Sequence, residues 1–420
     1  MGLSYLPRVC LMSQQGPILV IGNSGRPSFA AALDDAGMFP VIDGDWTNAV
    51  RAVSDVQPAA VVVDMAGVDQ ARFEALARQI DRRKPYVPLI AVEPEGALPE
   101  NALPLSLSGG NYDRLIPRLR AALRVRALDA TVLRRLADES PGPTRLIEND
   151  STLHATVLLI GRGGAFPALS VALGERAGVV GAFSIEAAAG HLANRDIDGI
   201  VISEGFTARV VDAFLTVLSE DARFRKLPVV LTADELAPAY ELPNLEIITG
   251  EPAHIAANTL PLVRQHALEA QLGRTLRSIE AKGLLDPQTG LLTPAAFERD
   301  FAGAVSQTLA EGGGLAVARF AFDPKYPRAQ FDGARIISRL MRKMDFGAAR
   351  PDGSVIVVFS DTDLRNAHAI ARRLSAVMRH TATGRRGARN EPVVTIAGLG
   401  PKDSAKSLLA LLYNETRAAS

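Results

Sequence analysis

A pattern of short apolar runs separated by helical segments occurs twice in the chain, and it constrains the fold more than any other feature. Each copy opens on a β-branched and aliphatic run that ends in glycine, at residues 17–22 and 155–161. Such runs are typical of strands buried on both faces of a sheet. Because strands alternate with helical segments, we expect two α/β domains with parallel sheets, at residues 15–140 and 152–282.

The later strands follow the same order in both copies. Further apolar runs lie at residues 59–64, 88–92 and 103–107 of the first copy and 198–203, 228–232 and 245–249 of the second. An arginine-rich amphipathic helix is expected to close the first domain at 115–136, and a longer one to close the second at 256–282. Four aliphatic residues of the second helix recur at spacings of four, four and three: Leu268, Leu272, Leu276 and Ile279. This stripe suits a coiled coil and an ordinary core-facing helix equally well.

Composition excludes several classes of protein. A chain of 420 residues with 47% hydrophobic residues is long enough for about three packed domains. The 46 basic and 46 acidic residues cancel, so the chain is not expected to wrap DNA. The apolar runs are too short to cross a bilayer, so no membrane insertion is expected.

The single cysteine, Cys10, excludes a disulfide scaffold and fits a reducing, cytoplasmic compartment. Residues 1–14 are expected to be an N-terminal extension. Met12 directly precedes the first strand segment, so either Met1 or Met12 could be the true start.

Residues 283–420 show a different pattern. Strands are predicted at 315–322, 354–359 and 393–399, and helices at 295–310, 331–344, 363–380 and 404–417. The segment Arg350-Pro351-Asp352-Gly353 has turn chemistry and predicts a hairpin. We therefore expect an α+β domain here.

The first two units resemble response-regulator receiver domains, which have a flavodoxin-like fold with a parallel five-stranded sheet. The resemblance implies a phosphoacceptor at the end of the third strand, where the first unit has Asp64. Gly22-Asn23 replaces the acidic pair that would hold Mg²⁺, and residues 106–110 lack the expected lysine. Because Mg²⁺ loses most of its charged ligands, phosphotransfer to Asp64 should be slow or absent. The alternative role for Asp64 is a solvent-facing carboxylate at a strand end.

The second unit departs further from the receiver pattern. Ser203 stands at the phosphoacceptor position, Gly161-Arg162 replaces the acids, and Glu251-Pro252 stands where the resemblance implies Lys-Pro. Thr232 alone matches. Both units are therefore expected to act as interaction or dimerisation modules.

The third unit resembles GGDEF diguanylate cyclase domains over roughly residues 283–417. Leu285 to Thr293 followed by Phe297 is similar to the family's opening signature, with Thr293 in place of its asparagine. Arg342 to Thr362 aligns without gaps with its R-x-x-D motif, hairpin and following strand, and Val394 to Gly398 with a late strand.

The catalytic hairpin of that family is lost. Gly-Gly-Asp/Glu-Glu-Phe has become Pro351-Asp352-Gly353-Ser354-Val355. Proline removes a backbone donor, and glycine and serine cannot replace carboxylates that bind Mg²⁺. Asp323 alone remains of the acidic run after the first strand of this unit. We therefore expect no enzyme activity, no cofactor and no bound Mg²⁺.

The R-x-x-D motif survives as Arg342 and Asp345. In active cyclases it is the inhibitory site for cyclic di-GMP, and Arg373 aligns with a further arginine of that site. Arginine offers a rigid donor fork to guanine O6 and N7, and aspartate accepts from guanine N–H groups. We expect Arg342 and Asp345 to share one face of a helix end. Four other cations are expected to add positive potential for the phosphates: Arg339, Lys343, Arg350 and Arg372.

The order of units resembles that of PleD-type response regulators and, more closely, PopA-type effectors. The resemblance implies an inactive cyclic di-GMP receptor in two-component and cell-cycle signalling, with protein partners that include proteolysis adaptors, and a homodimer as one option. Three alternatives stay open. They are an active diguanylate cyclase, a phosphorylation-dependent regulator that uses Asp64, and a ligand-free scaffold in which Arg342 and Asp345 form only an ion pair.

Overall fold

The computed structural model describes residues 16–23, 25–37, 40–107, 112–139, 154–232, 240–379 and 391–418. The expected extension at residues 1–14 lies outside this range. The described residues belong to two compact units. The first is drawn from residues 1–146, 161–172 and 198–269, and the second from 147–160, 173–197 and 270–420. The three-domain division expected from the sequence stays a prediction.

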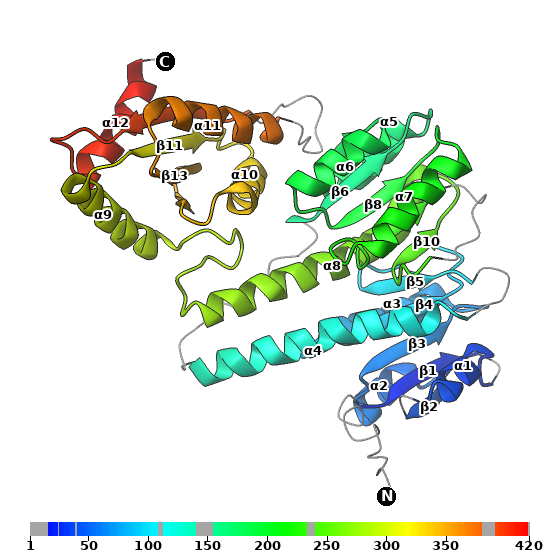
Figure 1. The fold of residues 1–420 in the computed structure, drawn as a ribbon. Helices are drawn as coiled ribbons and strands as arrows, with labels where there is room; N and C mark the ends of the chain where they lie inside the picture. Colours follow the sequence, from blue (N-terminus) through cyan, green and yellow to red (C-terminus); the bar gives the residue numbers. More distant parts are fainter. Residues whose placement is uncertain are drawn as a thin grey trace, which may run out of the picture. The chain divides into compact units, whose positions relative to one another are not determined.

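The first parallel sheet has five strands in the order β2-β1-β3-β4-β5 (Figure 1). The strands are β1 (Ile18–Gly22), β2 (Val41–Asp45), β3 (Ala60–Asp64), β4 (Leu89–Val92) and β5 (Ala102–Leu105). The helices are α1 (Phe29–Asp35), α2 (Ala49–Val56), α3 (Gln70–Asp81) and α4 (Leu115–Glu139). The sequence did not predict β2, because this edge strand is exposed or half-buried throughout and lacks an apolar run.

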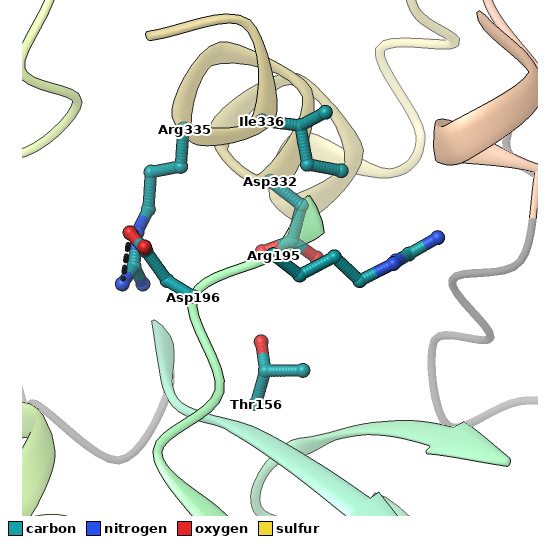
Figure 2. A pocket seen from close by; sticks show the side chains of 6 residues that line it. All are labelled: Thr156, Arg195, Asp196, Asp332, Arg335 and Ile336. Atoms are coloured by element: carbon teal, nitrogen blue, oxygen red, sulfur yellow. Dashed lines mark hydrogen bonds and ion pairs between the residues drawn. The ribbon is translucent and has the colours of Figure 1, made fainter. Parts of the chain in front are cut away.

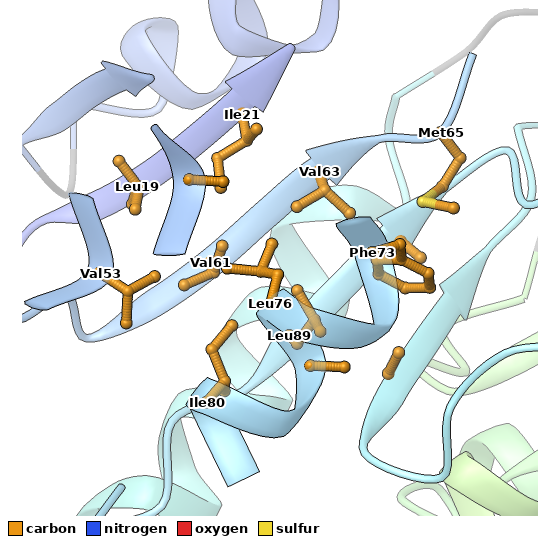
Figure 3. Packing of buried hydrophobic residues seen from close by; sticks show 14 of the residues in the cluster. Leu19, Ile21, Val53, Val61, Val63, Met65, Phe73, Leu76, Ile80 and Leu89 are labelled. Atoms are coloured by element: carbon orange, nitrogen blue, oxygen red, sulfur yellow. The ribbon is translucent and has the colours of Figure 1, made fainter. Parts of the chain in front are cut away.

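Helices α2 and α3 pack on one face of this sheet (Figure 3). Val53 of α2 and Phe73 and Ile80 of α3 meet Leu19 and Val61 of the strands, and all five are nearly or fully inaccessible to solvent. Each fully buried side chain of this kind contributes about 1.5–3 kcal/mol. The apolar runs seen in the sequence thus form the core that fixes the carboxyl end of β3.

The second parallel sheet has the order β10-β9-β8-β6-β7. Its strands are β6 (Thr156–Ile160), β7 (Gly178–Ala182), β8 (Gly199–Ile202), β9 (Val229–Leu231) and β10 (Leu245–Ile247). The helices are α5 (Phe166–Gly174), α6 (Ile185–Asn194), α7 (Ala208–Glu220) and α8 (Pro252–Glu280). Read from β7, this is the strand order of the first sheet, which confirms the two parallel five-stranded sheets expected from the repeat.

A buried ion pair connects α4 with β10 inside the first unit. The side chains of Arg118 and Glu246 are both 0% exposed, and Arg118 Nη2 lies 2.7 Å from Glu246 Oε1. Arg118 also donates to the carbonyls of Pro104, Pro243 and Leu245. Burial lowers the pKa of Arg118, and the Glu246 carboxylate opposes this shift. The buried charge is tolerated because N–H groups on each side of the guanidinium donate to an oxygen.

The third sheet is antiparallel, in the order β12-β13-β11-β14. Its strands are β11 (Leu315–Ala321), β12 (Phe346–Ala349), β13 (Ser354–Ser360) and β14 (Val393–Gly398). The helices are α9 (Pro294–Glu311), α10 (Pro327–Leu340), α11 (Leu364–Met378) and α12 (Ala405–Ala418). This is the α+β arrangement expected from the sequence.

Side chains along β13 alternate between the two faces of this sheet. Val355 and Val357 face a cluster shared with α10 and α11, whereas Ile356 and Val358 face one shared with α9 and α12. Helices therefore cover both faces of the sheet. The ends of its strands and the connecting turns are left to carry polar groups.

Helix α10 spans residues 327–340 and not the 331–344 expected from the sequence. Pro327 begins the helix earlier, because proline at the first helical position already has a suitable φ and lacks only an N–H that would be unpaired there. The helix also ends earlier, since Met341 is extended and β12 begins at Phe346.

The stripe on α8 is only partly covered. Leu272 is buried, and Leu268, Leu276 and Ile279 are half-buried. Within the described ranges, no helix is long and apolar enough to cross a membrane.

Candidate functional site

Arg342 and Asp345 lie on a four-residue turn between α10 and β12, and not on a helix end. The Asp345 N–H donates to the Arg342 carbonyl over 3.1 Å, which closes a β-turn. Arg342 and Lys343 are exposed, whereas Asp345 is 7% exposed. The expectation of a shared helix face was wrong because α10 stops at Leu340, yet the turn still brings residues 342 and 345 together.

The carboxylate of Asp345 is held from the end of β13. Its Oδ1 accepts from the Ser360 N–H over 3.2 Å, and Ser360 Oγ donates to the Met344 carbonyl over 2.9 Å. Burial raises the pKa of Asp345, and the Ser360 N–H and the charge of Arg342 offset only part of this rise. The structure gives no ion pair between Arg342 and Asp345 among the residues it describes. The alternative in which these two residues form only an ion pair therefore has no such contact to rest on.

The sequence did not identify Ser360 as part of the site. Its signal lies in the pairing of β12 with β13, where Phe346 faces Val358 and residue 344 therefore comes opposite residue 360. That register could not be read without knowing where β12 begins.

Arg373 lies on α11, which packs with α10 against the same sheet face. Its side chain is exposed, as is that of Arg372. In the described chain, no hydrogen bond or ion pair joins Arg373 to Arg342 or Asp345. The three predicted ligand residues are thus two exposed guanidiniums and one inward carboxylate.

Two of the four additional cations are already neutralised. Arg339 Nη1 lies 2.9 Å from Asp196, and Arg350 Nη2 lies 2.6 Å from Glu298. Arg350 also lies over the Phe297 ring, 5.1 Å from its centroid. The positive potential near the turn therefore comes from fewer residues than the sequence suggested.

Residues 350–353 form the predicted hairpin turn between β12 and β13. The Arg350 N–H donates to the Ser354 carbonyl over 2.8 Å, and the Gly353 N–H donates to the Arg350 carbonyl over 3.2 Å. Gly353 has φ +82°, which favours glycine. Gln330 of α10 fills the hairpin mouth and donates to the carbonyls of Arg350 and Ser354 over 2.7 and 3.0 Å.

Asp352 serves this turn structurally. Its Oδ2 accepts from Arg319 over 3.0 Å, and its Oδ1 accepts from the Ser354 N–H and hydroxyl over 3.1 and 2.6 Å. Burial alone raises the pKa of Asp352, but the bonds from Ser354 and Arg319 outweigh it and lower the pKa below its ordinary value. Arg319 is fixed in turn over the Tyr413 ring, 4.5 Å from its centroid.

The residues around the hairpin do not fit the Mg²⁺ that a cyclase needs. Both oxygens of Asp352 already accept hydrogen bonds, and Asp323 Oδ1 accepts from the Lys325 N–H over 2.9 Å within its own loop. No cluster of three or more His, Cys, Asp or Glu side chains that could hold a metal occurs in the described parts of the chain.

Asp64 lies at the carboxyl end of β3 and is half-buried. Its Oδ1 accepts from the Ala66 N–H over 3.1 Å. Asn23, which stands in place of an acid, donates to the Gly67 carbonyl over 3.0 Å and so ties the loop after β3 to the end of β1. The predicted phosphoacceptor is therefore at a strand end with an amide in place of a metal ligand.

The corresponding edge of the second sheet is filled by its own side chains. Ser203 is 5% exposed, and Glu204 packs so closely over Gly163 that a Cβ there would clash with its carboxylate. The Arg162 N–H donates to the Glu204 carbonyl over 2.9 Å. Glycine at 163 thus makes room for Glu204 and not for a phosphate.

A small, open pocket lies in the second unit, between α10 and the chain at the start of β6 and the end of α6 (Figure 2). It is lined by Thr156, Arg195, Asp196, Asp332, Arg335 and Ile336. Burial lowers the pKa of Arg195 to about 10. The sequence did not identify this pocket, because its residues come from segments that lie far apart in the sequence.

Comparison with known proteins gives similarity to solved structures only. No family model matches the sequence, and no curated protein matches it. The GGDEF domain of DgcB from Caulobacter crescentus, solved in complex with c-di-GMP, is 16% identical, with 32% of this chain and 89% of that chain covered and a TM-score of 0.28. The FimX GGDEF domain from Pseudomonas aeruginosa is 18% identical, covering 31% and 90%, with a TM-score of 0.29. A sensory box/GGDEF family protein from Caulobacter crescentus is 22% identical, covering 32% and 99%, with a TM-score of 0.27.

Proposed function

We propose that this protein is a catalytically inactive receptor for cyclic di-GMP in bacterial signal transduction. The observation that carries the proposal is the turn at 342–345, where an exposed guanidinium stands beside a carboxylate that Ser360 holds in place. The ligand would contact Arg342, Asp345 and Arg373. Receptors of this kind are cytoplasmic, and we place this protein there.

The residue types of the turn suit a guanine base. Arg342 can direct two parallel N–H donors to guanine O6 and N7, while an ionised Asp345 accepts from the N1 and N2 groups of guanine. Arg373 supplies a second cation for a phosphate or a stacked base. An adenine would leave Asp345 facing an acceptor at N1, so the site should reject cyclic di-AMP.

The hairpin supports the absence of cyclase activity. Asp352 is engaged by Arg319 and Ser354, Gln330 closes the hairpin from α10, and the second carboxylate needed for a metal pair is missing. GTP condensation needs a metal to stabilise the developing charge, and these side chains do not provide for one.

The output we propose is control of protein–protein contacts. The two parallel-sheet units, with their receiver-like strand order, would serve as interaction modules, with a homodimer or an adaptor for regulated proteolysis as the partners. No part of this output depends on DNA or on a membrane.

Calorimetry with the purified full chain tests the proposal. Micromolar binding of cyclic di-GMP is expected for the native protein, with loss of binding in Arg342→Ala. Arg365→Ala is the matched control, because Arg365 is also an exposed arginine of the same domain but lies at the start of α11. Absence of binding by the native protein, or equal loss in both variants, would overturn it.

Two further assays separate the alternatives. Incubation with GTP and Mg²⁺ should yield no cyclic di-GMP, and a product would restore the cyclase interpretation. Acetyl phosphate should not phosphorylate Asp64. The native protein and Asp64→Asn should therefore show the same level of modification. A modification lost in that variant would favour a phosphorylation-dependent regulator, because Asp64 does lie at a strand end.

A further inference from the structure

Three arginines of α10 share one face of the helix and all bind the same neighbouring segments of the second unit. They are Arg328, Arg335 and Arg339, at spacings of seven and four, which brings residues onto one helix face. Arg328 donates to the Ala155 carbonyl and to Thr156 Oγ1, and Arg335 Nη1 donates to the His154 carbonyl over 3.2 Å.

Asp196, just beyond α6, is the carboxylate at which two of these arginines meet. Arg335 Nη2 lies 2.9 Å from its Oδ2, and Arg339 Nη1 lies 2.9 Å from its Oδ1. Burial raises the pKa of Asp196, but Arg335 and Arg339 together lower it below its ordinary value. Asp196 therefore bridges two cations, and Figure 2 shows its contact with Arg335.

Arginines from α10 and from the residue after α6 bind the C-terminal ends of two helices, α6 and α11. Arg339 donates to the carbonyls of Leu192 and Ala193 in the last turn of α6, over 3.2 and 3.4 Å. Arg195, which follows α6, donates to the Val377 carbonyl in the last turn of α11. Cations at helix C-termini bind carbonyls that lack intrahelical partners and complement the helix dipole.

This contact is held by charged groups and by one ring pair: the Arg335 side chain is 6% exposed, and the ring centroids of His154 and Phe331 lie 4.2 Å apart. The side chains of Asp196 and Arg339 are 33% and 32% exposed, and the pocket between the segments is open to solvent. Ion pairs that remain partly solvated weaken as salt rises. A contact of this kind can open and close without disturbing the buried core of either sheet.

We infer that Asp196 is an ionic latch that reversibly holds α6 and the start of β6 against α10. The latch acts on the candidate ligand site through the chain itself, because α10 ends only two residues before Arg342, and the Arg195 bond reaches the helix that carries Arg373. This inference does not rest on ligand binding. It holds for the free protein.

Thiol labelling tests the latch without any ligand. With Cys10 replaced by serine, Thr156→Cys places one thiol in the pocket wall at a residue that is 6% exposed. Ala371→Cys places a reference thiol in the core between α11 and the sheet, at a residue that is 1% exposed. Adding Asp196→Asn should raise the labelling rate at position 156 at least about tenfold, because charge-assisted bonds are lost, and leave position 371 unchanged.

The controls separate latch opening from unfolding. Glu391→Gln removes an ion pair with Arg379 elsewhere in the same unit and should change neither rate. Arg339→Gln should act like Asp196→Asn, and combining the two should add little. If Asp196→Asn unfolds the chain, both thiols will react fast, and salt is then used in place of the substitution. In the protein that keeps Asp196, about 1 M NaCl should raise the labelling rate at position 156 and not at position 371. Unchanged labelling at 156, or equal acceleration at 371 under salt, would overturn the latch.

Discussion

The turn at 342–345 and the hairpin at 350–353 flank the same short strand, β12. Each contains an aspartate, and the pKa values of the two aspartates are shifted in opposite directions. Asp352 accepts three hydrogen bonds, one of them from a buried arginine, and its pKa is lowered. Asp345 accepts from backbone N–H groups, those of Ser360 and Arg342, and burial raises its pKa.

Under the proposed function, Asp352 serves the fold and Asp345 is left for the ligand. The charge of Asp352 is balanced inside the chain, so nothing is gained by offering it a metal. The charge of Asp345 lacks a matched donor set, and a guanine edge would supply one. We therefore propose that Asp345, and not Asp352, is the carboxylate that binds the ligand.

The largest expected effect is on ligand affinity. Asp345→Ala should weaken cyclic di-GMP binding by about 100-fold, because two hydrogen bonds to a charged acceptor are lost at about 1.5 kcal/mol each. Asp352→Ala should leave the dissociation constant within about twofold. Calorimetry on both variants measures the difference, and equal losses would show that the two carboxylates are not separated in function.

The free energy of unfolding should depend more on Asp352 than on Asp345, the reverse of the order expected for ligand affinity. Asp352→Ala leaves the 11%-exposed side chain of Arg319 without its carboxylate and should lower the free energy of unfolding by about 1–2 kcal/mol. The loss is moderate because the Asp352 side chain is itself 36% exposed. Asp345→Asn should change it by less than about 1 kcal/mol, since only backbone N–H groups donate to this side chain. Urea unfolding of the two variants decides this, and a larger loss in Asp345→Asn would contradict it.

Acid should act on the two carboxylates with opposite sign. Because the folded pKa of Asp352 is lowered, its contribution to stability is present above the ordinary pKa of about 3.8 and falls as pH drops through the folded value. Because the folded pKa of Asp345 is raised, the folded chain binds more protons than the unfolded chain just above 3.8, and acidification there favours folding.

In unfolding measured from about pH 7 down to about pH 4, Asp345→Asn should therefore move toward the native protein, whereas Asp352→Asn should approach it only as pH falls below about 3.8. Asp352→Asn begins less stable than the native protein and Asp345→Asn more stable. Shifts of the same sign would refute the assignment of the two pKa directions.

The smallest expected effect concerns the residue that positions Asp345. Ser360→Ala removes the hydroxyl bond to the Met344 carbonyl but keeps the N–H that binds Asp345. Affinity should fall about two- to fivefold, in line with one neutral hydrogen bond of about 1 kcal/mol or less. Ser360→Thr keeps the hydroxyl and should bind like the native protein. A loss as large as that of Asp345→Ala would mean that Ser360 contacts the ligand directly.

The sequence predicted the core strands and the edge strands β5, β10 and β14, but it missed the edge strands β2, β7 and β12. Runs such as 59–64 are apolar because both faces of β3 are covered, whereas β2 and β12 lie at sheet edges and carry mixed or small residues. Helix α10 was placed four residues too late, because its stripe continues past Leu340 and only the pairing of β12 stops the helix.

The candidate site was predicted by residue type but not by geometry. Arg342 and Asp345 lie on a turn and not on the expected helix. They are still neighbours, since a helix and a β-turn both bring residues three positions apart close together. Ser360, Gln330 and Asp196 were missed because their roles come from strand register and from contacts between distant segments. No local pattern in a single sequence encodes such contacts.

The buried pair of Arg118 and Glu246 has a practical consequence for dissecting the molecule. Arg118 lies on α4, the helix that follows the first sheet, whereas Glu246 lies on β10 of the second sheet, and both side chains are 0% exposed. Any fragment that ends between them would carry an orphaned charge beside an uncovered edge strand, β5 or β10, which invites aggregation. Expression boundaries for this protein should therefore keep residues 16–269 together. Measurements on a fragment that contains one sheet alone would describe a misfolded fragment and not the native protein.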